Sequence, residues 1–284
     1  MSFIESPTEA AWLQHWTTAV ADGTADGNAN GDANGNADTA ELAARAGAGA
    51  DRLAWVFMSG YQGAVRACFP EFAGPGWSCF AAAEAKDAPP CVLAPAADGH
   101  RLHGSKSWVA GARSLARLVV SVGEGDARRF VCVARDAPGL VLSEPRAPSF
   151  LAELSQGAAT FEDVAVGADQ LLADPVRAHW FRAAEPLHVL IALNACLGAQ
   201  AASAGDSSLA LTTVANVDLG AGLVPEIHDR VTVKAGLTEL RARTTEVVRQ
   251  FAEGPLAHAV PALGRSWETD ARLLTMFGVS GAEA

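Results

Sequence analysis

The chain has 284 residues, half of them apolar and 19% charged, with a formal net charge of −11. This is the composition of a globular protein that is long enough for one large domain or two to three small ones. The negative charge and the lack of Lys/Arg runs argue against binding to nucleic acid or to an anionic membrane surface.

The N-terminal residues, the hydropathy and the cysteines predict a cytoplasmic protein. Residues Met1–Ala10 carry Glu5 and Glu9 and lack a basic segment followed by an apolar core, so no conventional secretion signal is predicted. The most apolar stretch, Leu187–Ala202, is interrupted by polar residues and is too short to cross a bilayer. Five cysteines without a C-x-x-C pair are expected to be reduced thiols.

Residues 1–76 are predicted to form an N-terminal helical segment that contains a loop. Trp12 and Trp16, four positions apart, indicate a short helix over 7–20, and a second helical stretch runs from Thr39 to about Cys68. Between them, residues 22–38 consist of Asp, Gly, Asn, Ala and Thr, which predicts a flexible loop. A calcium-binding repeat is disfavoured there, because the regular apolar position of such repeats is missing.

Residues 77–174 are predicted to form a small β-domain. Valine-rich runs at 116–122 and 129–134 are separated by Gly-Glu-Gly-Asp, which predicts a hairpin. Further strands are expected at 98–109, 140–142 and 158–166, with proline and glycine marking the loops between them.

Residues 175–284 are predicted to form a C-terminal helical domain. One helix should cover about 183–211, a second should run from Pro225 to Gly254-Pro255, and a last one should cover 267–277. The predicted fold class is therefore α+β, with N-terminal helices, a central small β-barrel or sandwich and a C-terminal helical bundle.

Four segments carry a family resemblance. They are, in chain order, GHRLHGSKSWVAGARSLARLVVSV (99–122), TFEDVAVGADQLL (160–172), LGAQAA (197–202) and DARLLTMF (270–277). Each is similar to a motif of the acyl-CoA dehydrogenase superfamily, and they occur in the order of that family. The chain resembles a shortened, divergent member.

The resemblance implies a reaction, a cofactor and partners. Family enzymes hold FAD between the β-domain and the C-terminal helices, and a carboxylate removes the α-proton of an acyl thioester while a hydride passes to the flavin. Because a thioester α-proton is weakly acidic, the base must be close and the carbonyl polarised. The implied substrate is an acyl group on coenzyme A or on an acyl carrier protein, and the implied assembly is a homodimer or a hetero-oligomer with a homologue.

The position of the family base is changed in this chain. The glutamate that follows the last motif is replaced by Gly278. Some members carry the base on the first C-terminal helix, and the matching position here is His188, with Glu185 three residues before it. A histidine can accept a proton near neutral pH. The alternative is that His188 is a helix residue hydrogen-bonded to a neighbour.

The positions that contact FAD in the family are also altered. Glu84 is all that remains of a Thr-Glu-Pro-x-x-Gly-Ser-Asp loop, and Trp108 and Ala110 stand where the family has Trp-Ile-Thr/Ser. Trp108 can equally be an ordinary core aromatic. Ser280 matches a threonine that can hydrogen-bond the cofactor, whereas the diphosphate-binding motif is absent. Each lost charge-assisted hydrogen bond weakens binding by about 1.5–3 kcal/mol.

Three functions remain open. The first is a flavoprotein that oxidises an acyl thioester in specialised metabolite biosynthesis. The second is a flavin-free isomerase, dehydratase or cyclase with His188 or Glu185 as the acid/base. The third is a non-catalytic partner subunit of an active homologue. No metal site is predicted, because His100 and His103, three apart on a strand, point to opposite faces.

Overall fold

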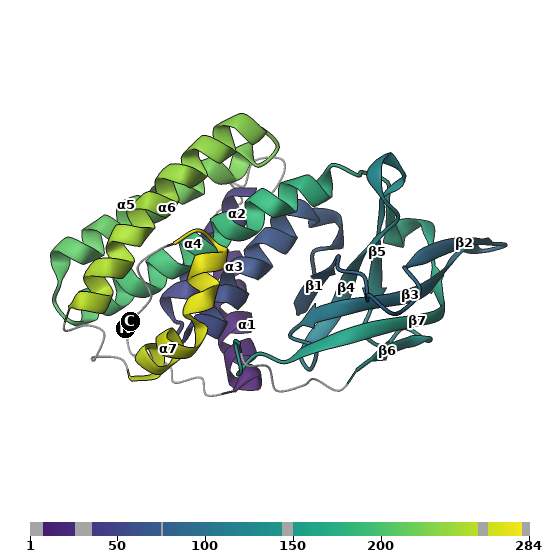
Figure 1. Cartoon of the computed structure of the whole chain (residues 1–284), viewed down its shortest axis with the longest axis horizontal. Coiled ribbons are helices and arrows are strands. Elements are labelled where there is room, and N and C mark those ends of the chain that lie inside the picture. Colours follow the sequence, from purple (N-terminus) through teal and green to yellow (C-terminus); the bar gives the residue numbers. More distant parts are fainter. Residues whose placement is uncertain (1–7, 26–35, 75, 144–149, 255–260, 280–284) are drawn as a thin grey trace. The chain divides into compact units, whose positions relative to one another are not determined.

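The computed structural model describes residues 8–25, 36–74, 76–143, 150–254 and 261–279 (Figure 1). The chain divides into two compact units. A helical unit combines residues 1–70, 149–153 and 179–284, so helices from both ends of the chain pack together. A β unit comprises residues 71–148 and 154–178. The predicted α+β class, with a β region between two helical regions of the sequence, is confirmed.

The helical elements, in chain order, are α1 (Glu9–Ala25), α2 (Asn36–Ala48), α3 (Leu53–Cys68), α4 (Arg177–Ser203), α5 (Ser207–Leu223), α6 (Arg230–Glu253) and α7 (Pro261–Met276). The predicted loop at 22–38 is shorter than expected, because residues 22–25 belong to α1 and residues 36–38 to α2. Alanine favours a helix, and a single glycine costs only about 1 kcal/mol there. The rest of that loop lies outside the described residues.

Two helices predicted as continuous are each divided in two. The stretch 39–68 is interrupted between α2 and α3, and the stretch 183–211 is interrupted at residues 204–206. At the second break Gly205 has a φ of 81°. Asp206 then caps α5, its carboxylate accepting a hydrogen bond from the Leu209 N–H at 3.0 Å. A left-handed glycine followed by an aspartate cap ends one helix and starts the next.

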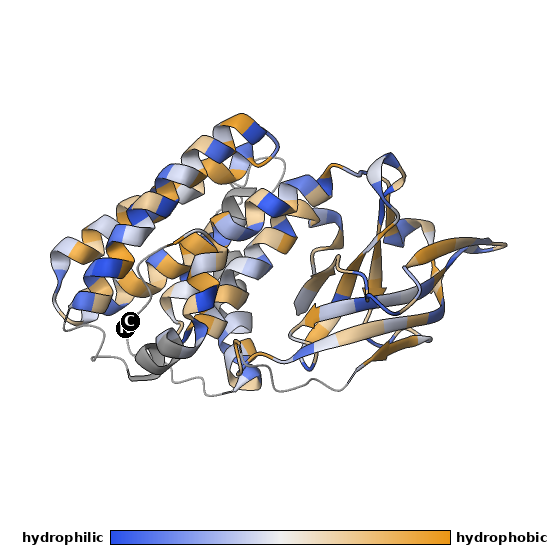
Figure 2. Cartoon of the chain, viewed as in Figure 1, coloured by the Kyte–Doolittle hydropathy of each residue, from blue (hydrophilic) through white to orange (hydrophobic). Residues whose placement is uncertain are grey.

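Helix α4 is the central helix of the helical unit. Its residues 187–193 are all buried, and apolar residues run through its middle (Figure 2). A Cβ on Gly60 of α3 would lie 2.4 Å from the Cα of Val189, so the absence of a side chain lets the two backbones touch. Trp12 of α1 stacks on Trp55 of α3, with ring centroids 5.8 Å apart.

The β unit contains two four-stranded sheets. The strands are β1 (Trp77–Ala81), β2 (Val92–Ala96), β3 (Gly99–Ala110), β4 (Leu115–Val122), β5 (Arg129–Ala134), β6 (Leu140–Leu142), β7 (Gln156–Val166) and β8 (Leu171–Leu172). One sheet has the order β1-β4-β5-β8 and the other β2-β3-β7-β6. The predicted hairpin is confirmed, since β4 and β5 pair antiparallel across residues 123–128.

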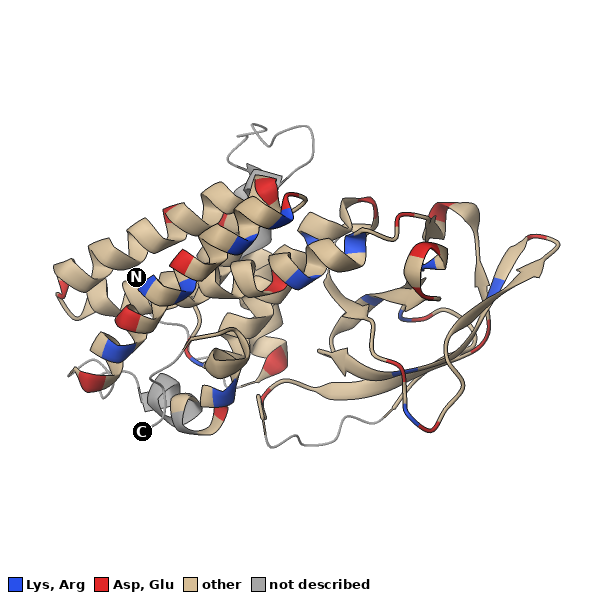
Figure 3. Cartoon of the chain, turned by 45° about the horizontal axis from the view of Figure 1, so that its top comes forward, with Lys and Arg blue, Asp and Glu red and all other residues tan. Residues whose placement is uncertain are grey.

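The hydropathy of the helices and the distribution of charged residues bear on whether the protein contacts a membrane. By length and composition α4 and residues 207–226 could each cross a membrane, but 78% of the apolar window of α4 is buried inside the protein, as in the core helix of a globular domain. For residues 207–226 the buried share is 33%. Acidic and basic residues are interspersed over the described part of the chain (Figure 3). The cytoplasmic location stays a prediction.

Candidate active site

Three of the four segments that carry the family resemblance have a clear role in the fold. Gly104 of the first has a φ of 110°, and a Cβ there would meet the Pro90 carbonyl oxygen. Gly198 of the third faces the Thr213 side chain, which lets α5 approach α4. Asp270 of the fourth is buried and accepts a 2.7 Å hydrogen bond from the Leu151 N–H. The motifs therefore specify architecture in this chain.

His188, one candidate base, lies in the interior of the helical unit. Its side chain is fully buried on α4. The Nδ1 atom lies 2.8 Å from the Ala184 carbonyl oxygen, and the Nε2 atom lies 3.1 Å from the Thr39 hydroxyl oxygen. Because a carbonyl only accepts, the proton resides on Nδ1 and Thr39 donates to Nε2. Burial lowers the pKa of His188 to about 4, so the ring is neutral at pH 7.

Glu185, the other candidate, lies one helical turn before His188 and is half-buried. Burial raises the pKa of its carboxyl to about 7. A carboxyl with a pKa near neutrality is present in both protonation states around pH 7, so it can both accept and return a proton. Of the two candidates, Glu185 is the one with solvent access and a pKa suited to proton transfer.

Gly278, which stands where the family has its glutamate, forms the C-terminal cap of α7. Its φ is 78°, its N–H donates to the Thr275 carbonyl, and the next N–H, from Val279, donates to the Leu274 carbonyl. These two bonds are those of a Schellman motif, which favours glycine at this position. A Cβ on Gly278 would lie 3.0 Å from Nε of Arg241. The left-handed backbone conformation at position 278 therefore favours glycine.

Glu84 forms an ion pair with the buried Lys106. One carboxylate oxygen of Glu84 lies 2.5 Å from Nζ of Lys106, and the other accepts from the Cys91 N–H at 3.3 Å. The Lys106 side chain is fully buried and also donates to the Ala82 carbonyl at 3.2 Å. A buried ammonium needs a partner charge. The pair explains the presence of Glu84 without a cofactor.

The next two positions assigned to FAD offer little to a flavin. The indole N–H of Trp108 donates to the Gln156 side chain at 3.1 Å. Ala110 is fully buried, and its backbone N–H donates to the Cys79 sulfur at 3.3 Å. Ser280, the remaining position, lies outside the described residues. At the described positions the polar groups of Glu84 and Trp108 thus have partners within the protein, and Ala110 has no polar side-chain group.

A buried polar network in the helical unit was not identified from the sequence. The Asn194 amide donates to the Thr244 hydroxyl at 2.8 Å and accepts from the Asn216 amide at 2.9 Å. These residues lie on α4, α6 and α5, and each is at most 1% exposed. A network with its hydrogen bonds satisfied fixes the register of three helices. Asn194 within the apolar run of α4 was the available signal.

Comparisons with known proteins find similarity in structure but not in sequence. Neither a protein-family model nor a curated protein sequence matches the chain. The FMN-bound structure of TdsC, a dibenzothiophene monooxygenase from Paenibacillus sp. A11-2, is 16% identical, with a TM-score of 0.62 over 85% of this chain and 80% of its own.

Two further solved structures share the architecture. Glutaryl-CoA dehydrogenase from Mycobacterium smegmatis is 13% identical, with a TM-score of 0.59 over 98% of this chain and 87% of its own. FkbI, for biosynthesis of the methoxymalonyl extender unit of a polyketide immunosuppressant, is 16% identical, with a TM-score of 0.54 over 83% and 78%. At these identities the likeness shows a common fold.

Proposed function

We propose that this chain, which has the acyl-CoA dehydrogenase fold, transfers a proton at the α-carbon of an acyl thioester, with Glu185 as the acid/base group. The observation that carries the proposal is the setting of Glu185, a half-buried carboxyl on the central helix of the helical unit. No hydrogen bond to this carboxylate is found among the described residues. An unpaired, partly desolvated carboxyl is a strong base for a carboxylate.

Glu185 would act first as a general base and then as a general acid. Its ionised carboxylate takes the α-proton, and the pKa of about 7 makes the resulting acid stable enough to hold that proton. If the thioester is β,γ-unsaturated, returning the proton to its γ-carbon moves the double bond into conjugation with the carbonyl, an isomerisation that requires no electron acceptor. His188, buried and hydrogen-bonded at both nitrogens, supports the helix that carries Glu185.

A flavin would turn the same first step into an oxidation. The oxidoreductase form of the proposal is supported by the fold that the chain shares with FMN-bound TdsC and with glutaryl-CoA dehydrogenase. Glu84 and Trp108 already form hydrogen bonds within the protein, to Lys106 and Gln156, and this favours the flavin-free form instead. A visible spectrum after incubation with FAD or FMN separates the two forms. No absorbance in the flavin band with either cofactor would reject the oxidoreductase form.

Exchange of the α-proton tests the common step directly. We would incubate the protein with acyl-CoA thioesters of several chain lengths in D2O and measure deuterium at the α-carbon by mass spectrometry. We expect Glu185→Gln to slow exchange by about 100-fold or more, and Glu239→Gln, an exposed helix residue, to have no effect. Exchange that is absent in the natural chain, or unchanged in Glu185→Gln, would reject the proposal.

We also propose that a second copy of the chain, or a homologue, covers the outer face of α5. Leu211 and Val214, three positions apart on one side of α5, are 71% and 55% exposed, which is unusual for large apolar side chains. Light scattering after gel filtration should give a dimer or larger for the natural chain and a smaller species for Leu211→Asp. If the chain is a non-catalytic subunit, exchange appears only when a homologue is added.

A further inference from the structure

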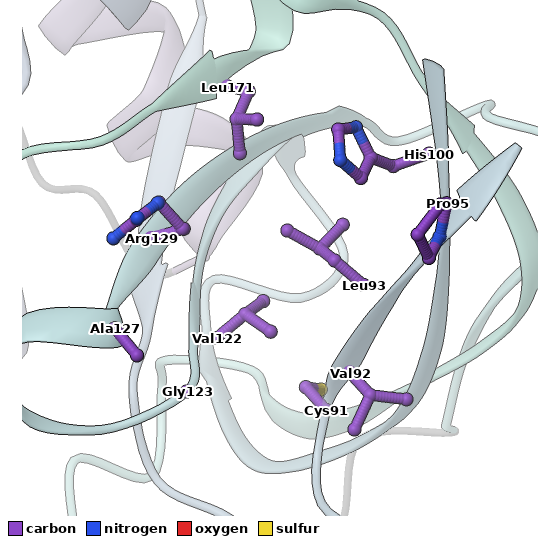
Figure 4. A pocket seen from close by; sticks show the side chains of 10 residues that line it. All are labelled: Cys91, Val92, Leu93, Pro95, His100, Val122, Gly123, Ala127, Arg129 and Leu171. Carbon is purple, nitrogen blue, oxygen red and sulfur yellow. The ribbon is translucent and has the colours of Figure 1, made fainter. Parts of the chain in front are cut away.

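A groove of about 400 Å³ opens between the two sheets of the β unit. Strands β2 and β3 of one sheet and β4, β5 and β8 of the other contribute to it (Figure 4). Most of its lining is apolar, and it includes Val92, Leu93, Pro95, Val122 and Leu171. Figure 4 shows Leu93 in the centre of this ring of side chains. Val92 is 50% exposed, so part of the apolar surface faces solvent.

Two side chains of the groove are basic. His100 and Arg129 lie on opposite sides of Leu93 (Figure 4). Nη1 of Arg129 donates to the backbone carbonyls of Asp126 and Arg128 at 3.1 and 2.9 Å, which holds the guanidinium against the backbone there. No carboxylate is among the described lining residues. The whole chain has a net charge of −11, so a lining with basic side chains and no carboxylate differs in charge from the rest of the protein.

The third ionisable group of the lining, the Cys91 thiol, contributes as an apolar group. It is almost fully buried, and burial raises its pKa to about 11. A thiol with that pKa is protonated at neutral pH and is a poor nucleophile. The groove therefore has the features of a binding site and lacks those of a second catalytic centre.

We propose that the groove binds a small carboxylate with an apolar tail of about eight carbons. The volume suits about a dozen non-hydrogen atoms, if each takes the share of a water molecule in the liquid. The tail would lie on Leu93, Val122 and Leu171, and the carboxylate would face Arg129, whose fixed guanidinium presents donors to an anion. All of these residues belong to the β unit, so the site is distinct from Glu185 and does not depend on the function proposed for it.

Titration with octanoate, followed by amide resonances of the full-length protein, tests the proposal. We expect saturable shifts at residues 91–95, 122–129 and 171, little binding of acetate, and weaker binding of octylammonium and octanol than of octanoate. Arg129→Gln should weaken octanoate binding about tenfold, because one charge-assisted contact is lost.

Matched variants separate the groove from the rest of the unit. Leu93→Asp places a like charge in the centre of the groove and should abolish octanoate binding. Leu142→Asp, on the opposite edge strand of the same sheet, should leave it unchanged. Arg101→Gln, outside the lining, is the control for Arg129→Gln. Equal binding of octylammonium and octanoate, full binding by Leu93→Asp, or no groove shifts at millimolar octanoate would each overturn the proposal.

Discussion

The Thr39 hydroxyl and the His188 ring, 149 positions apart in the chain, meet within the helical unit at 3.1 Å. With the 2.8 Å contact from Nδ1 to the Ala184 carbonyl, this bond satisfies both nitrogens of the imidazole. A buried histidine with both nitrogens paired is held in one neutral tautomer. This hydrogen bond joins α2, which carries Thr39, to α4, which carries both His188 and Glu185.

Removal of the Thr39 hydroxyl should destabilise the protein. In Thr39→Val the shape is kept but Nε2 of His188 is left buried without a donor, so we expect the free energy of unfolding to fall by about 1–3 kcal/mol. Thr39→Ser keeps the hydroxyl and should lose less. Urea unfolding at pH 7 measures the difference, and a Thr39→Val protein as stable as the natural one would contradict the hydrogen bond.

Glu185 and His188 should make opposite contributions to the pH dependence of stability. Glu185 has a pKa of about 7 in the folded state against an ordinary 4.5, so its contribution to stability falls as pH rises through that interval. His188 has a pKa of about 4 against an ordinary 6.5, so its contribution falls as pH drops from 6.5 to 4. Each pKa difference corresponds to about 3 kcal/mol, and the two effects largely cancel between pH 4.5 and 6.5.

The variant Glu185→Gln should stabilise the protein more at high pH than at low pH. It removes the cost of ionising a desolvated carboxyl, so we expect a gain of about 3 kcal/mol at pH 8 and no gain at pH 4. Urea unfolding across pH 4–8 measures this. A gain that is the same at every pH would mean that Glu185 titrates normally, which would also weaken its case as the base.

Substitution of Glu84 should affect the stability of the β unit. In Glu84→Gln the buried Lys106 ammonium loses its charge partner and keeps the Ala82 carbonyl, so we expect a loss of about 2 kcal/mol, because the carboxylate itself is partly exposed. The double variant Glu84→Gln/Lys106→Met should recover most of it. If Glu84 served a cofactor instead, the single variant would keep its thermal stability and lose only cofactor binding.

Restoring a glutamate at position 278 should not restore a family-like base. The left-handed backbone of Gly278 disfavours any side chain, and a Cβ would press on Arg241. We expect Gly278→Glu to lower the free energy of unfolding by about 1–2 kcal/mol, with no faster α-proton exchange. Gly278→Asn should be milder, because asparagine tolerates this conformation. A stable Gly278→Glu protein with faster exchange would show that the cap can be rebuilt.

The sequence by itself determined the order of elements, the β4–β5 hairpin and the resemblance that indicated the fold. These features depend on neighbours in the chain: valine-rich runs around Gly123–Asp126 make a hairpin, and short motifs keep their spacing. The breaks at Gly49–Arg52 and Ala204–Asp206 were missed, because apolar periodicity continues on both sides of each.

Only the tertiary structure distinguished Glu185 from His188. Both lie on the same helix one turn apart, and the sequence cannot show which of them α2 and α3 enclose. The same holds for Glu84, since the buried Lys106 that engages it lies 22 residues away. Burial and long-range hydrogen bonds set the pKa of an ionisable group, and these are properties of the folded chain rather than of its local pattern.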